Sequence, residues 1–280
     1  MESARTYPPG VPCWIDTEQP DPEAARYFYG RLFGWTFEDV GADDAPYHVA
    51  SLSGVPVAAI AAPRPSGGGR AAWVTYVAVD DADAHAEAVT GAGGEVLAEP
   101  RDGPAGARIA HCADPTGAPF GLWQARTRAG AQAINVPGAW NFSDLHTTDA
   151  DAARGFYGEL FGWETKGIDA GAGEFATLLR VPGYGAHRAE TVDPEVGELA
   201  ARTPDGFEDG VGWLAGLDFE RDRPHWHVTM LVPDRDEAVS TAQRLGAEIV
   251  STRDTRWNRS ALVVDPQQAV LTLSQFASAV

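Results

Sequence analysis

The chain has 280 residues, 44% of them hydrophobic, which is enough for two domains that each bury a core. Its formal charge of −19 argues against a nucleic-acid partner, because binding phosphate requires a basic surface, and against an anionic membrane surface. The sequence contains no run of eighteen apolar residues and no apolar stretch near its first residue. We therefore expect neither a transmembrane helix nor a secretory signal, and we expect a cytoplasmic protein.

Two segments of the chain repeat each other. Residues 21–35 read DPEAARYFYGRLFGW and residues 149–163 read DADAARGFYGELFGW, with eleven of fifteen positions identical at an offset of 128. Each segment starts with an aspartate suited to an N-cap and ends near a glycine suited to a helix stop. Apolar residues recur every three or four positions between these ends. Each segment is predicted to be an amphipathic helix preceded by a short strand.

A second pair of segments, 72–97 and 226–250, shares another plan: strand, acidic turn, helix, glycine and strand. Their aspartates and glycines match at an offset of 153, and each half then closes with a DP turn and a strand. The chain is therefore expected to contain four similar units, two in each half. The larger offset places about 25 extra residues in the second half, at about 184–222, where we expect a helical lid or flank.

This order of strands, FY and LFGW helices, and DP turns resembles the vicinal oxygen chelate superfamily, which includes glyoxalases, bleomycin-resistance proteins and extradiol dioxygenases. The resemblance covers an N-terminal domain at 10–125 and a C-terminal domain at 138–277, joined by a linker at 126–137. It implies an α+β fold in which four βαβββ units form two curved mixed β-sheets with flanking helices. Each sheet would enclose a cup, formed either within one half or by exchange of units between halves.

Metal-dependent members of this superfamily hold a divalent ion in the cup with His and Glu side chains from four strand positions. Three of these positions can be placed in each half, and only one of the six carries a ligand side chain. They are Trp14, Val74 and Gly121 in the first half and Phe142, His227 and Thr272 in the second. The fourth ligand position falls near Ala58 in the first half and near His187 or Glu190 in the second half. We therefore expect no cofactor, with a divalent metal on His227 as the alternative.

An aromatic and apolar surface would line the cup of the first half. Its members are Trp14, Val74, Tyr76 and Trp123. Two interpretations stay open, a packed core or domain interface and a stacking surface for a flat ligand. Asp16, which corresponds to Asp144 in the second half, either binds a ligand of its own or bonds to backbone.

The second half keeps polar side chains in its cup. Alternation along two strands places Phe142, Asp144 and His146 on one face, and His225, His227 and Thr229 on one face. If Asp144 approaches His227, the two could form a general acid–base pair that works near neutral pH. They could also be hydrogen-bonded packing residues, or the remnant of a metal site that uses His146, His187 or Glu190. We expect His225 to lie in solvent at the end of its strand.

The favoured hypothesis is a protein that binds a small, aromatic or polyketide-like molecule in the C-terminal cup without a metal. It would either sequester this ligand or catalyse a proton-transfer isomerisation, cyclisation or lyase step, as a monomer or a homodimer. The candidate catalytic residues are His227 and Asp144. The candidate ligand-binding residues are Phe142, His146, Thr229, Thr272, Trp14, Asp16, Tyr76 and Trp123. A metal-dependent glyoxalase-like lyase or an extradiol-type dioxygenase or hydroxylase is the alternative, followed by a purely structural role.

Overall fold

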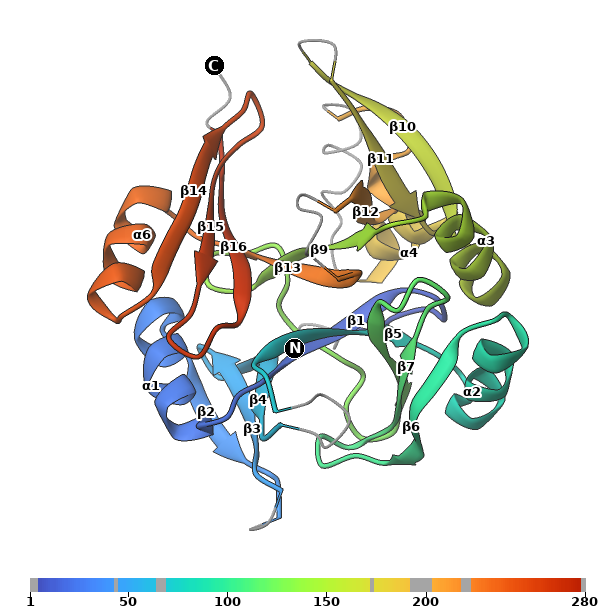
Figure 1. Ribbon diagram of the computed structural model, residues 1–280, viewed down its shortest axis with the longest axis horizontal. Helices are drawn as coiled ribbons and strands as arrows, with labels where there is room; N and C mark the ends of the chain where they lie inside the picture. Colours follow the sequence, from blue (N-terminus) through green and yellow to red (C-terminus); the bar gives the residue numbers. More distant parts are fainter. Residues whose placement is uncertain are drawn as a thin grey trace. The chain divides into compact units, whose positions relative to one another are not determined.

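A computed structural model describes residues 5–42, 45–63, 69–171, 174–191, 203–217 and 223–277. In these ranges each half of the sequence supplies the strands of one eight-stranded mixed sheet (Figure 1). The first sheet has the order β2-β3-β4-β1-β5-β8-β7-β6, and the second has the order β10-β11-β12-β9-β13-β16-β15-β14. The predicted α+β fold with two mixed sheets is therefore confirmed, and each sheet is built within one half. No helix in the described ranges is long and apolar enough to cross a membrane.

The strands of the two sheets follow the same plan. Those of the first sheet are β1 (Pro12–Glu18), β2 (Thr36–Asp39), β3 (Tyr47–Leu52), β4 (Val55–Ala61), β5 (Ala72–Ala78), β6 (Glu95–Asp102), β7 (Ala107–Ala113) and β8 (Pro119–Ala125). Those of the second sheet are β9 (Trp140–Thr147), β10 (Glu164–Gly171), β11 (Glu174–Arg180), β12 (Gly210–Gly216), β13 (His225–Leu231), β14 (Glu248–Asp254), β15 (Asn258–Val264) and β16 (Val270–Phe276). In each sheet the first strand of the half pairs parallel with the fourth.

The repeated helices have the ends that their sequences predict. α1 (Pro22–Phe33) starts after Asp21, whose side chain accepts a hydrogen bond from the backbone N–H of Ala24. α3 (Ala150–Phe161) starts after Asp149, which caps two backbone N–H groups in the same way. Both helices end at a glycine in the left-handed region, with φ of 75° at Gly34 and 67° at Gly162, a conformation that glycine adopts without strain. The other helices are α2 (Ala82–Gly91), α4 (Tyr184–Thr191) and α6 (Arg235–Arg244).

The extra segment of the second half differs from its prediction. Residues 210–216 form β12, the counterpart of β4, and do not belong to a helical flank. Of the segment predicted at 184–222, α4 and a short 3-10 turn at Phe207–Asp209 are helical, whereas residues 192–202 and 218–222 lie outside the described residues. Glycines at both ends of GVGWLAG hid this strand, because glycine is depleted in strands.

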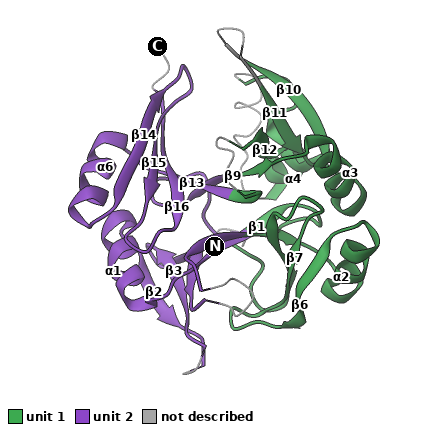
Figure 2. Ribbon diagram, in the orientation of Figure 1, with its two compact units in different colours: residues 1–13, 75–130, 143–226 green, residues 14–74, 131–142, 227–280 purple. Residues whose placement is uncertain are grey.

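The chain divides into two compact units that do not coincide with the sequence halves (Figure 2). Unit 1 comprises residues 1–13, 75–130 and 143–226, and unit 2 comprises residues 14–74, 131–142 and 227–280. Each unit combines one βαβββ element of the first half with one of the second, and each has its own hydrophobic core. Within the units α2 packs against α3 and α1 packs against α6.

Tyrosines of the FY motif join the two halves inside each unit. In unit 2 the Tyr29 hydroxyl donates to the carboxylate of Asp265 over 2.7 Å. In unit 1 the Tyr157 hydroxyl donates to the carboxylate of Asp114 over 3.2 Å. Both aspartates belong to the DP turn of the other half, and burial raises the pKa of both phenols.

Tryptophans of the LFGW motif make a second reciprocal contact. Trp35 donates from Nε1 to the carbonyl of Gly138 over 2.7 Å, and Trp163 donates to the carbonyl of Gly10 over 2.6 Å. Both glycines have φ of 85° and precede the first strand of the other half. The repeated motifs therefore hold the halves together, and their aromatic side chains are buried in the cores.

Candidate functional site

In unit 1 three large side chains of the first sheet pack against one another. The Tyr76 hydroxyl lies 2.9 Å from Nε2 of His111, and the Tyr76 ring meets Trp123 edge-on at 5.7 Å between centroids. The Tyr76 ring also covers Gly121, where an added Cβ would lie 2.0 Å from the ring. This packing agrees with the core interpretation of the first half, and a ligand-stacking role for Tyr76 and Trp123 stays a prediction.

In unit 2 two successive hydrogen bonds link three side chains of the first sheet. The Trp14 indole N–H donates to the hydroxyl of Tyr47 over 3.0 Å, and this hydroxyl donates to Oδ2 of Asp16 over 3.1 Å. Trp14 and Asp16 are fully buried, and Val74 is also buried in this unit. The carboxylate of Asp16 therefore takes its hydrogen bond from the protein itself. A ligand-binding role for Trp14 and Asp16 stays a prediction.

Asp144 occupies the corresponding place on β9 of the second sheet, in unit 1. Its neighbour Leu145 belongs to the core beneath the helices, so the side chain of Asp144 lies on the opposite face, here called the cup face. The residue is half-buried, and its Oδ1 is excluded from solvent without a hydrogen-bond partner. Burial raises the pKa of Asp144 to about 7, although a hydrogen bond from the backbone of Trp213 acts in the opposite direction.

Strand register explains why the two aspartates differ. Asp16 pairs with Ala59, which pairs with Val49, and Tyr47 is two residues before Val49 on the same face. In the second sheet Asp144 pairs with Trp213, which pairs with Leu178. The counterpart of Tyr47 is therefore Ala176, two residues before Leu178, and its methyl group has no hydrogen to donate.

Aromatic rings share this face with Asp144. His146, two residues along β9, stacks on His225 with 4.9 Å between ring centroids and 11° between planes. His225 is half-buried and its Nδ1 donates to the carbonyl of Arg223 over 2.8 Å, so it is not the solvent-exposed residue that we expected. Trp213 is half-buried and lies 5.9 Å from the ring of Phe207. Trp213 is not among the predicted site residues, because it falls in the segment predicted as a helical flank.

The other predicted residues of the second half lie in unit 2. His227 is 7% exposed, and its Nε2 lies 2.8 Å from the hydroxyl of Thr272. Thr229 is the register partner of Thr272 on the neighbouring strand, so the two side chains share a face. Phe142 is half-buried. The pairing of His227 with Asp144 stays a prediction, because the two residues belong to different units.

The residues present do not fit the metal centre that the superfamily implies. Among the described residues no three His, Cys, Asp or Glu side chains gather closely enough to hold a metal ion. His187 and Glu190 lie on α4 and not on a strand, and the register places Gly212 at the position that corresponds to Ala58. His227 is then the single nitrogen, sulfur or carboxylate ligand at the four positions of the second half.

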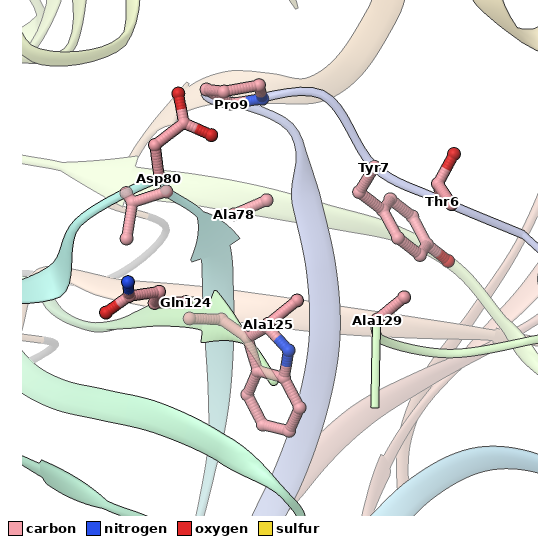
Figure 3. Close-up of a pocket in the computed structure, with 10 residues that line it drawn as sticks. Thr6, Tyr7, Pro9, Ala78, Asp80, Gln124, Ala125 and Ala129 are labelled. Carbon is pink, nitrogen blue, oxygen red and sulfur yellow. The ribbon is translucent and has the colours of Figure 1, made fainter. Parts of the chain in front are cut away.

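A cavity of about 220 Å³ lies elsewhere in unit 1 (Figure 3). The N-terminal segment and the ends of β5 and β8 line it, with Tyr7, Asp80, Trp123 and Gln124 among its residues. Two of its polar groups already have partners in the protein: Gln124 Oε1 accepts from the backbone N–H of Ala82, and the Trp123 indole donates to the carbonyl of Arg128. None of the second-half candidates lines this cavity, and we do not place the function there.

Comparisons with known proteins agree with the fold. Residues 19–122 match the Glyoxalase/Bleomycin resistance protein/Dioxygenase superfamily, and residues 142–273 match a Glyoxalase-like domain. CFP32 of Mycobacterium bovis is 33% identical over 98% of this chain and 97% of its own. The anthracycline biosynthesis protein DnrV of Streptomyces peucetius is 34% identical over 94% of this chain and 92% of its own.

A solved structure shares the fold at much lower sequence identity. The Mn(II)-bound glyoxalase from Novosphingobium aromaticivorans is 17% identical, with a TM-score of 0.59 over 95% of this chain and 82% of that chain. The chain belongs to the glyoxalase, bleomycin resistance protein and dioxygenase superfamily, that is, the vicinal oxygen chelate superfamily.

Proposed function

We propose that the second half of this protein binds a small, flat organic molecule, aromatic or polyketide-like, and that Asp144 exchanges a proton with it. The observation that carries the proposal is the carboxylate of Asp144, which has a solvent-excluded oxygen without a partner and a pKa of about 7. A general base works best when its pKa lies near the working pH. Groups with shifted pKa values cluster at functional sites.

The rings around Asp144 support an aromatic ligand. Trp213, His146 and His225 lie on the cup face of unit 1, and Trp213 and His146 are half-buried. Flat rings stack on indole and imidazole faces. DnrV, which matches nearly the whole chain, is named for anthracycline biosynthesis, and an anthracycline contains a fused aromatic ring system. This likeness supports a polycyclic ligand here.

The proposal assigns the chemistry to protein side chains because three of the superfamily's four ligand positions in the second half carry residues other than His or Glu. The four positions carry Phe142, Gly212, His227 and Thr272. His227 is proposed as a second proton-transfer group, held by its hydrogen bond with Thr272. Metal analysis of the wild type and of the His227→Ala variant tests the alternative of a metal-dependent enzyme. That alternative requires a stoichiometric metal in the wild type and its loss in the variant.

Hydrogen–deuterium exchange of 2-tetralone in D2O, followed by NMR, tests the proton transfer directly. Asp144 would take a proton from the carbon beside the ketone, leaving an enolate, and the enolate would take back a deuteron. We expect the wild type to accelerate the exchange and Asp144→Asn to lose about 100-fold or more of that acceleration. Asp16→Asn, the same change at the matched position, should retain it. His227→Ala should abolish exchange while the far-UV circular dichroism stays unchanged.

Binding without catalysis is the sequestering form of the same proposal. If 2-tetralone quenches tryptophan fluorescence of the wild type but its exchange is not accelerated, the protein sequesters such a molecule. Trp213→Ala should weaken this binding about three- to tenfold, the range expected for one aromatic contact. Trp257→Ala is the control, because Trp257 is 45% exposed in the other unit. Equal affinity of the Trp213→Ala variant and the wild type would contradict the proposed surface.

A further inference from the structure

We infer that the ligand of the second half carries a phenolic hydroxyl that donates a hydrogen bond to Asp144, as the hydroxyl of Tyr47 does to Asp16 in the first half. This inference rests on the proposed function and narrows its ligand class. It uses the duplicated chain as its own template, because one copy of the unit contains the interaction that the other copy lacks.

The first half shows the complete interaction. The phenol of Tyr47 lies between a donor and an acceptor, because it accepts from the indole of Trp14 and donates to Asp16. All three side chains are buried. A hydrogen bond to a carboxylate is stronger than one between neutral groups, so this position on the sheet is suited to bind a phenol oxygen.

The second half has the carboxylate without the phenol. Strand register places Ala176 where the first half has Tyr47, and tyrosine differs from alanine by one phenol group. The residue two positions before Asp144 is Phe142, which lacks the N–H group of Trp14. A buried carboxylate oxygen without a donor is unfavourable, and Oδ1 of Asp144 is in that state. A ligand that brings its own phenol removes this penalty.

The neighbouring side chains favour a phenol over other ligand groups that donate a hydrogen bond. Trp213 is the register partner of Asp144, whereas the small Ala59 is the partner of Asp16, so an indole side chain shares the face of the sheet with the carboxylate. An organic ammonium ion would also pair with the carboxylate of Asp144, but an aliphatic ammonium has no flat face to stack on the rings of His146 and His225, which share this face. A phenol is uncharged and flat, and it satisfies both the carboxylate and the aromatic surface.

The test compares 2-naphthol with 2-methoxynaphthalene, which has the same rings but no hydroxyl hydrogen. Isothermal titration calorimetry measures both probes with the wild type, Asp144→Leu and Asp144→Asn. We expect the wild type to prefer 2-naphthol at least tenfold. Asp144→Leu should lose most of this preference, and Asp144→Asn should lose a smaller but measurable part, because its amide oxygen accepts a hydrogen bond without the charge of the carboxylate. The affinity of both variants for 2-methoxynaphthalene should change less than twofold. Because the asparagine variant keeps the shape of the side chain, the test holds even if the leucine variant fails to fold.

The converse test adds a phenol to the second half by substitution. Ala176→Tyr should place a phenol of the protein beside Asp144 and abolish the preference for 2-naphthol, whereas Ala176→Ser should keep it. Equal binding of both probes by the wild type, with no effect of either Asp144 variant, would overturn the phenol inference and leave the proposed aromatic site standing. Failure of both probes to bind the wild type would overturn the proposed aromatic site, and the phenol inference with it.

Discussion

Asp16 and Asp144 occupy the same position in two copies of one structural unit, but their surroundings differ. Asp16 is fully buried and accepts a hydrogen bond from Tyr47, whereas Asp144 is half-buried with a solvent-excluded oxygen that has no partner. After a duplication, one copy can maintain the fold while the other loses contacts. The difference between the copies therefore points to the second half as the site of function, since an unsatisfied buried carboxylate weakens the folded state.

The largest effect that we expect is on the pH dependence of the free energy of unfolding. The folded-state pKa of Asp144 is raised to about 7, whereas an unfolded aspartate titrates near 3.9. As pH rises, the unfolded state releases this proton at a lower pH than the folded state does. The free energy of unfolding therefore falls between about pH 4 and about pH 7 and stays at the lower value above about pH 7. Removing the carboxyl with Asp144→Asn removes this decrease, which is about 2–4 kcal/mol.

Urea unfolding at about pH 4 and about pH 8 measures this effect for the wild type and the variant. The free energy of unfolding of the wild type, minus that of Asp144→Asn, should fall by about 2–4 kcal/mol between the two conditions. Asp16→Asn is the matched change in the first half, where the carboxylate has its phenol partner. A pH-independent difference for Asp144→Asn would show that the carboxyl titrates normally in the folded protein.

A smaller effect is expected when the phenol of the first half is removed. Tyr47→Phe leaves the indole of Trp14 and the carboxylate of Asp16 without the hydroxyl that joins them. Because both groups are buried, the variant should lose about 2–3 kcal/mol of unfolding free energy. Ala176→Phe in the second half breaks no such bond, so thermal unfolding of the pair compares the two copies. Equal losses would mean that the hydrogen-bonded chain of the first half adds nothing to stability.

The sequence predicted the fold because its signals are local. Helix caps, the apolar periodicity of α1 and α3, and the repeat at an offset of 128 are all visible in short segments. The sequence left open which elements of the two halves pack together, because Tyr29 and Asp265 are 236 positions apart and their contact depends on tertiary packing. The strand β12 was missed because glycines interrupt it and its segment has no counterpart of equal length.

The candidate site was predicted in part. The alternation of β9 and β13 placed Asp144 and His146 on one face and His227 on the face of its own strand, and Asp16 was found because it corresponds to Asp144. The replacement of Tyr47 by Ala176 was not found, since it depends on the register of strands that the sequence repeat does not cover. The run VGWLAG was the available signal for Trp213, because an apolar segment of that length fits a buried strand.

The smallest effect that we expect separates the two tyrosines of the FY motif. Tyr157→Phe removes a hydrogen bond from Oδ2 of Asp114 and one from the indole N–H of Trp226, because the hydroxyl of Tyr157 donates to the first and accepts from the second over 2.9 Å. Tyr29→Phe should cost less, because Oδ2 of Asp265 keeps a hydrogen bond of 2.8 Å from the side chain of Gln19. We expect losses of about 2 kcal/mol for Tyr157→Phe and about 1 kcal/mol for Tyr29→Phe.

Urea unfolding at neutral pH measures both variants against the wild type. If Tyr29→Phe destabilises as much as Tyr157→Phe, then Gln19 does not compensate for the lost phenol, and the double variant Gln19→Leu with Tyr29→Phe should add little. If the order is as expected, the same double variant should approach the loss of Tyr157→Phe, because Oδ2 of Asp265 then lacks the donors Gln19 and Tyr29. The two copies of the repeated motif would then stabilise their units unequally, through the partners that each tyrosine has acquired and not through the motif itself.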